Sequence, residues 1–401
     1  MASSTSDSAS SAVARGVDLE RIARTALALI DAPSPTCSAG PAADRLAEIL
    51  TDLGFTVERP VADWPASPAV VARLDSGRPG RVLQIDGHLD TVHLPFVPAR
   101  MVDGIIHGSG AADMKGGVAA EVEAVSVLRD ADLLPAGGVL LTAHDHHEGP
   151  WGDKRQLQAL IREGYRGDGV LLPEYLADRL PVAGRGLAIF SIRVWRDGEP
   201  MHEVLGPAGI PDVLATGADL VTRFRELNRG LVALRVEHAG SDSIFLGQLQ
   251  CGEIYNQWPT ECRLAGTRRW TAPGRGEEVQ AEFARILAEV ARVSGTHIDS
   301  EFTQYADAFA LDPADPLAEA FQQAHESVTG HRLPAGGKPF VDDGSGFAEQ
   351  AGIPSVTHGP AATGAHSLHE AVPVAELARV ARVYALTAVA YCAGADQGRS
   401  R

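Results

Sequence analysis

The sequence has few cysteines, too little positive charge for a polyanion partner and no long apolar run. Its four cysteines are widely spaced and form no C-x-x-C pair, which favours buried thiols in a reducing compartment over a disulfide framework. The formal net charge of −17 argues against nucleic acid and anionic membranes as partners, because both bind basic surfaces. No stretch reaches the roughly 18 apolar residues of a membrane span, so no transmembrane helix is predicted.

The start of the chain also lacks a targeting signal. Its first dozen residues are rich in Ser and Ala and contain no apolar core, so we predict a disordered tail over residues 1–17 and no signal peptide. The predicted lack of a signal peptide and the expected free thiols together make the cytoplasm the expected location. A chain of 401 residues exceeds the roughly 250–300 at which a single core stops growing, so two domains are expected.

The hydrophobic pattern predicts an α/β domain that a second domain interrupts. Helical periodicity alternates with short strand-like runs up to about Pro181, which is typical of a mainly parallel sheet. Residues 188–195 then alternate in period two, as a half-solvated antiparallel strand does. The α/β pattern returns from Pro313. The expected boundaries are 18–182 and 308–401 for the α/β domain and 183–307 for an inserted α+β domain.

Three segments of the first domain carry chemically active side chains beside predicted strands or helices. His88 and Asp90 follow a strand, and a metal-bound His usually needs a carboxylate to orient its second ring nitrogen. Asp113 lies between a glycine-rich loop and a helix start, where a helix N-cap is an equally good explanation. The loop from His144 to Glu148 holds five consecutive titratable residues, which favours a metal site over a solvated face.

Two further candidates are weak when taken singly. Glu174 ends a buried strand, and His366 lies in the segment Gly359–Glu370. Read in order, however, His88-x-Asp90, Asp113-Met-Lys-Gly-Gly, the His147-Glu148-Gly-Pro loop, Glu174 and Ala-His366-Ser resemble one enzyme family. That family contains the zinc-dependent aminoacylases, glutamate carboxypeptidases, acetylornithine deacetylases and succinyl-diaminopimelate desuccinylases. The resemblance extends from about Leu19 to Ala395.

The resemblance implies a fold and a quaternary structure. The expected fold is of the zinc-peptidase type: an α/β catalytic domain with a mainly parallel, phosphorylase/hydrolase-like sheet, and an inserted α+β lid. In the family this lid often forms the dimer contact, so a homodimer through the inserted domain is expected.

The resemblance also implies a role for each matched residue in a two-zinc site. His88 and Glu174 would hold one ion, Glu148 and His366 the other, and Asp113 both, while Asp90 would orient His88. Imidazole and carboxylate ligands suit Zn²⁺, with Co²⁺ or Mn²⁺ as substitutes. In such a site one ion polarises the scissile carbonyl, and the pair lowers the pKa of a shared water.

The inserted domain contains three further matches. His202 lies where the family has a lid histidine that reaches the neighbouring subunit's site and stabilises the oxyanion. Asn256 resembles the family's Asn-x-x-Pro substrate contact. Arg269 resembles an arginine that binds a substrate carboxylate, although a spacing one residue longer leaves Arg268 open. The implied substrate is a small molecule with a free carboxylate, such as an N-acyl amino acid or a dipeptide.

One position departs from the family pattern. The loop normally reads Glu-Glu, with the first Glu as general base and the second as metal ligand, whereas here it reads His147-Glu148. A neutral imidazole can act as a base near pH 7, so the first hypothesis is amide hydrolysis with His147 as the base. Two alternatives remain. The first is a non-hydrolytic biosynthetic enzyme that catalyses amide formation, cyclisation or elimination. The second is a non-catalytic relative that binds metal or ligand. His144 or His146 could also enter the site as an extra metal ligand.

Overall fold

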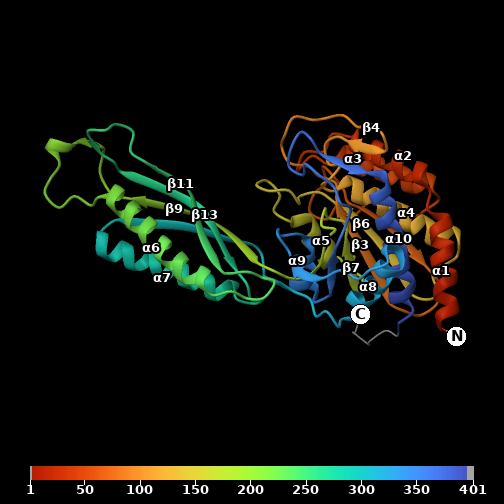
Figure 1. Cartoon of the computed structure of the whole chain (residues 1–401). Coiled ribbons are helices and arrows are strands. Elements are labelled where there is room, and N and C mark those ends of the chain that lie inside the picture. The colour runs from red at the N-terminus through yellow and green to blue at the C-terminus, as the bar shows by residue number, and fades with distance from the viewer. Residues whose placement is uncertain (1, 395–401) are drawn as a thin grey trace. The chain divides into compact units, whose positions relative to one another are not determined.

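The computed structural model describes residues 2–394, and the chain divides into two units (Figure 1). The second unit comprises Val182–Ala310 and Gly337–Val341, and the first contains the rest of the described chain. We had placed the boundaries after residues 182 and 307. The return of residues 337–341 to the second unit has no signal in the sequence.

A six-stranded sheet forms the centre of the first unit, with the strand order β1-β2-β6-β3-β7-β17. The four strands from β6 to β17 are parallel, whereas β1 and β2 are antiparallel at one edge. The central strands are apolar and buried because helices cover both faces of the sheet. The strand bounds are Val57–Glu58 (β1), Val70–Asp75 (β2), Val82–His88 (β3), Gly138–His144 (β6), Gly169–Leu172 (β7) and Ser355–Thr357 (β17).

Figure 1 shows α4 and α10 on one side of this sheet, and α5 and α9 on the other. Helix α2 buries an apolar stripe, whereas α4 and α10 are buried over most of their length. The mixed α/β class with a largely parallel sheet is therefore confirmed. The helix bounds are Leu19–Ile30 (α2), Gly40–Asp52 (α3), Lys115–Asp130 (α4), Arg155–Arg162 (α5), Pro316–Thr329 (α8), Asp343–Gly346 (α9) and Val374–Cys392 (α10).

The amino terminus corrects one prediction. Residues 2–16 form helix α1 (Ala2–Gly16), although the composition predicted a disordered tail over residues 1–17. The helix is anchored at its end: Val13 is fully buried, and Gly16 lies so close to Val127 of α4 that a Cβ would be only 3.0 Å from its methyl group. A single buried valine in a Ser/Ala-rich segment is too weak a signal to predict this packing.

Strand β3 is longer than its apolar run predicts, and this extension sets the position of His88. The strand-like run in the sequence covers residues 82–85, but pairing with β6 continues to the pair His88–His144. Asp86 is accommodated because it accepts a hydrogen bond from the Thr142 hydroxyl. Gly87 is required because a Cβ there would lie 2.7 Å from Val118. His88 and His144 therefore end two neighbouring parallel strands.

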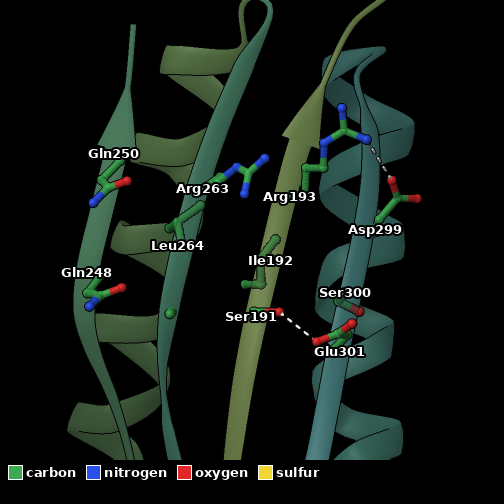
Figure 2. Close-up of a pocket in the computed structure, with 11 residues that line it drawn as sticks. Ser191, Ile192, Arg193, Gln248, Gln250, Arg263, Leu264, Asp299, Ser300 and Glu301 are labelled. Atoms are coloured by element: carbon green, nitrogen blue, oxygen red, sulfur yellow. Dashed lines mark hydrogen bonds and ion pairs between the residues drawn. The ribbon is translucent and has the colours of Figure 1, made fainter.

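The second unit is built on a four-stranded antiparallel sheet, in the order β11-β13-β9-β14. Helices α6 and α7 cover one face, and the other face carries polar side chains (Figure 2). Strand β9 alternates as predicted: Phe190 and Ile192 are buried, whereas Ser191 and Arg193 are exposed. The bounds are Gly186–Trp195 (β9), Val213–Ala233 (α6), Ser243–Cys251 (β11), Glu261–Trp270 (β13), Gly276–Ser294 (α7) and His297–Ala306 (β14).

Short strands complete the described chain. They are Arg100–Val102 (β4), Ile105–His107 (β5), Leu180–Gly184 (β8), Met201–His202 (β10), Gln257–Trp258 (β12), Phe309–Ala310 (β15), Ala335–Gly337 (β16) and Ala371–Pro373 (β18). No helix among residues 2–394 combines the length and the apolar composition that crossing a bilayer requires.

The aromatic core of the second unit gives a stability prediction. Phe283 of α7 is 3 % exposed and contacts the rings of Phe190, Phe224 and Phe302. Phe283→Ala should lower the free energy of unfolding by about 3–5 kcal/mol, because it removes buried apolar surface and leaves a cavity. Urea unfolding followed by tryptophan fluorescence measures the loss. As a control on the same helix, Val293→Ala removes a side chain that is 65 % exposed, and an equal loss there would contradict this account of the core.

Candidate active site

The candidate residues of the first unit meet at the carboxyl ends of its parallel strands. His88 is the last residue of β3, and Glu174 follows β7 by two residues. The loop after β6 carries His147 and Glu148. Open α/β sheets bind ligands at this edge because the loops of neighbouring parallel strands converge there.

Four of the predicted metal ligands form a continuous chain of contacts. Asp113 has one carboxylate oxygen 3.1 Å from Nε2 of His88 and the other 3.1 Å from Nε2 of His366. The same nitrogen of His366 is 3.2 Å from Oε2 of Glu148. Asp113 thus lies between two histidines, the position that a carboxylate bridging two ions needs. His88, Asp113 and Glu148 are buried, whereas the side chain of His366 is 52 % exposed and marks the open side.

These residues fit divalent cations. Two ligand atoms about 2.0–2.1 Å from one tetrahedral Zn²⁺ lie about 3.3–3.4 Å apart, close to the spacings above. Oε1 of Glu148 is buried and has no hydrogen-bond partner, which is costly unless a cation binds it. The ligand atoms of His88, Asp113 and Glu148 all lie within 4.8 Å of one another. The donor set and its spacing are those of a metal site.

The electrostatics of the site also favour positive charge. Burial by itself lowers the pKa of His88, but the hydrogen bond and charge of Asp113 outweigh burial and raise that pKa to about 10. Hydrogen bonds to Asp113 and Glu148 raise the pKa of His366 to about 11. Burial, followed by the charge of Asp113, raises the pKa of Glu174 well above its usual range. Bound cations would replace the protons that these groups otherwise retain.

Asp90 contacts His88 through its backbone. Nδ1 of His88 is 2.9 Å from the carbonyl oxygen of Asp90 but 3.6 Å from its carboxylate, the group expected to orient the ring. The carboxylate instead accepts the backbone N–H groups of His147, at 3.1 Å, and Glu148, at 2.9 Å. Asp90 therefore fixes the ring of His88 and the loop that carries Glu148.

Glu370 performs a similar function that the sequence did not indicate. Its Oε2 accepts the backbone N–H groups of Ala112, at 3.0 Å, and Asp113, at 3.1 Å. The segment Gly359–Glu370 drew attention only because of His366. A hydrogen bond from the backbone of Asp113 to a side chain 257 positions away has no signal in the sequence.

His147 is held between partners on both ring nitrogens. Nδ1 lies 2.7 Å from Oδ2 of Asp343 and 2.8 Å from Nζ of Lys154. Nε2 faces the candidate ligand Glu174, at 3.7 Å from Oε1. The ring stacks on that of His88, with centroids 3.9 Å apart and planes inclined by 13°. Neither Asp343 nor Lys154 was singled out from the sequence.

This stacking opposes a role for His147 as a ligand of the ion that His88 binds. The ligand atoms of His88, His147 and Glu174 lie within 4.8 Å of one another. An imidazole lone pair, however, lies in the plane of its ring. Two stacked, nearly parallel rings cannot both direct their lone pairs at one ion. The geometry suits a group beside the metal ligands rather than among them.

The other two histidines of the loop are engaged elsewhere. Nε2 of His144 lies 3.3 Å from Asp86 and 3.4 Å from Asp343, beneath the site. Nδ1 of His146 lies 3.2 Å from Asp153. In this structure neither joins the chain of ligand contacts.

The remaining candidates, His202, Asn256 and the two arginines, lie in the second unit. Nδ2 of Asn256 lies 3.1 Å from Nε2 of His202, and both side chains lie near the surface. Arg268 is buried and paired with Glu282 at 3.0 Å. Arg269 is half-buried; burial, and then the charge of Arg185, lowers its pKa. Of the two arginines left open, Arg268 is thus occupied by an internal carboxylate.

Comparison with known proteins defines the class. An aminopeptidase from Bacillus cereus matches the structure with a TM-score of 0.78 and 20% identity, over 93% of this chain and 99% of that one. A dinuclear metal-binding peptidase from Bacillus subtilis matches with a TM-score of 0.71 and 15% identity, over 94% and 98%. Both likenesses are of the fold; together with a peptidase family model that matches residues 85–390 and the cluster of His and carboxylate ligands, they define a metal-dependent hydrolase of amide bonds.

The sequence comparisons specify the family. The model of Peptidase family M20/M25/M40 matches residues 85–390, so the chain belongs to this family. Succinyl-diaminopimelate desuccinylase from Methylobacterium radiotolerans is 27% identical over 395 residues, which cover 92% of this chain and 97% of that protein. The resemblance noted in the sequence is therefore confirmed.

The contacts of Asp90 lead to a prediction about metal affinity. Asp90→Asn should weaken Zn²⁺ binding by about 10–100-fold, as expected for an outer-shell partner of a metal ligand, because it removes one acceptor oxygen from the ligand loop. Competition between the metal-free protein and a chelating indicator measures the affinity. Asp130→Asn, at an exposed helix end, is the matched control. An affinity equal to that of the wild type in Asp90→Asn would contradict this role.

Proposed function

We propose that the protein hydrolyses the amide bond of an N-acyl amino acid or small peptide, with two Zn²⁺ ions and with His147 as general base. Co²⁺ or Mn²⁺ are the substitutes that the same ligands would accept. The observation that carries the proposal is the placement of His147: Nε2 faces Glu174 beside the metal ligands, and Nδ1 contacts a buried carboxylate. An oriented imidazole next to a metal-bound water is the arrangement that general-base catalysis needs.

The proposal assigns a role to each residue of the first unit. His88 and Glu174 would hold one ion, Glu148 and His366 would hold the other, and Asp113 would contribute to both. When bound, the ions would polarise the scissile carbonyl and lower the pKa of the attacking water. Nε2 of His147 accepts the proton from that water and returns it to the leaving nitrogen. Asp90 keeps His88 and the loop of His147 and Glu148 in place.

The second unit would supply substrate contacts and the dimer interface. We propose that Arg269 binds a free carboxylate of the substrate, that Asn256 contacts the substrate and that His202 stabilises the oxyanion. The paired placement of His202 and Asn256 supports a shared role for these two. Strand β11 is an edge of its sheet and exposes Phe245 and Leu249, which supports a homodimer formed through this unit.

One contact favours a second function. Nζ of Lys154 lies 2.8 Å from Nδ1 of His147. If Lys154 donates its proton there, Nε2 carries the imidazole proton and His147 donates a hydrogen bond instead of accepting a proton. Such a site would suit a non-hydrolytic reaction of an amide or acyl group on the same scaffold. A non-catalytic relative has less support, because the ligand set is complete.

The base assignment predicts the behaviour of two variants. Metal-loaded wild type should hydrolyse at least one member of a panel of N-acyl amino acids and dipeptides, and His147→Ala should lose about 100-fold or more in kcat. His147→Glu should retain hydrolysis, because it restores the carboxylate base of the family. Amine release measures the rates, and metal content is checked for each variant. An inert wild type with an active His147→Glu variant would instead direct the search to the second function.

Arg269 gives a prediction about substrate binding. Arg269→Ala should raise KM by about 10–100-fold for substrates with a free carboxylate and leave kcat nearly unchanged, because a hydrogen bond to a charged group contributes about 1.5–3 kcal/mol. For the corresponding carboxamides, KM should not change. Arg263→Ala, on the polar face of the same sheet in Figure 2, is the matched control. Equal losses for both substrate classes would contradict a carboxylate contact.

A further inference from the structure

We infer that Asp343 is a positioning residue that keeps the His147 proton on Nδ1 and directs the Nε2 lone pair toward the metal ligands. The inference rests on the proposed role of His147 as general base. Asp343 is the first residue of α9 and is 1 % exposed. Its Oδ2 lies 2.7 Å from Nδ1 of His147.

The carboxylate of Asp343 is kept charged by a buried lysine. Nζ of Lys154 lies 2.9 Å from Oδ1 of Asp343, and both side chains are buried. A buried carboxylate with a paired cation stays ionised and remains a strong acceptor. Lys154 precedes α5 in the same loop as His147, whereas Asp343 comes from a distant part of the sequence. The contact therefore joins the base-bearing loop to α9.

Two hydrogen bonds compete for Nδ1 of His147: one from this nitrogen to Asp343, and one from Lys154 to this nitrogen. The surroundings of Asp343 favour the first. If Lys154 donated to Nδ1, Oδ2 of Asp343 would lose the N–H group of His147 and keep the longer contact with Nε2 of His144, at 3.4 Å. The proton on Nε2 would then face the metal ligands, at 3.7 Å from Glu174. Cations held there would repel that N–H group. With the proton on Nδ1, Asp343 accepts a hydrogen bond from His147 and keeps its ion pair with Lys154, and the lone pair faces the cations.

Histidine needs such a partner, whereas a glutamate base does not. A neutral imidazole has two tautomers, only one of which leaves Nε2 free, and its partner decides which is present. The stack on His88 restrains the plane of the ring, and Asp343 fixes its orientation within that plane. A glutamate at position 147 would place a second carboxylate near Asp343 and gain nothing from it. The role of Asp343 is thus specific to histidine at this position.

A double-mutant cycle tests the inference through this specificity. In the wild type, Asp343→Asn should lower kcat by about 100-fold and leave KM within about threefold, because the tautomer with a free Nε2 is lost. In the His147→Glu background the same substitution should leave kcat unchanged or raise it, because it removes a like charge. Equal losses in both backgrounds would overturn the inference, since they would mean that Asp343 only supports the fold.

A spectroscopic readout does not require turnover. In zinc-loaded protein with ¹⁵N-labelled histidine, the His147 signal should show the proton on Nδ1, and Asp343→Asn should move it to Nε2. Asp86→Asn, which removes the other carboxylate that faces His144, is the control and should leave the His147 tautomer unchanged. A proton on Nε2 in the wild type would overturn the inference. A proton on Nδ1 in a wild type that hydrolyses no substrate would contradict the proposed function and leave the positioning role standing.

Discussion

Burial of like charges at the carboxyl ends of β3, β6 and β7 is the constraint on which the rest of the site depends. Asp113, Glu148 and Glu174 are each at most 4 % exposed and lie near one another. Such a group is stable only with compensating positive charge, which two divalent cations supply. The surrounding residues then have one task, to hold the carboxylates and histidines at cation-binding distances. Asp90 and Glu370 perform it by fixing the backbone on both sides of the ligands.

On the proposed function, the change at position 147 exchanges one kind of base for another, and its neighbours match the exchange. A carboxylate has two equivalent oxygens and can accept and release a proton without reorientation. An imidazole has one free nitrogen, so its orientation and tautomer must be set. Asp343, Lys154 and the stacked ring of His88 together set them. These contacts give a physical reason for a working His base and make a simple loss of function the weaker interpretation.

Much of the fold could be predicted because its signals are local. Helical periodicity indicated the alternation of helices and strands in the first domain, and period-two alternation located β9. The metal ligands could be proposed because five motifs occur in a characteristic order. Asp343 could not be found in this way: it reaches His147 across 196 positions, and nothing in its surroundings in the sequence distinguishes it from other acids. The carboxylate of Asp90 was expected at His88, but two adjacent backbone N–H groups offer it stronger hydrogen bonds. Helix α1 escaped prediction because one buried valine anchors a segment of disordered composition.

The central claim is that the oxygen atom of a water molecule activated at this site is incorporated into the product. Turnover of an N-acyl amino acid in water enriched in oxygen-18, with mass analysis of the released acid, tests it most directly. Hydrolysis predicts one labelled oxygen atom in the new carboxylate for each bond cleaved. A substrate that is converted without incorporation of the label would contradict hydrolysis and would assign His147 and its partners to a different reaction.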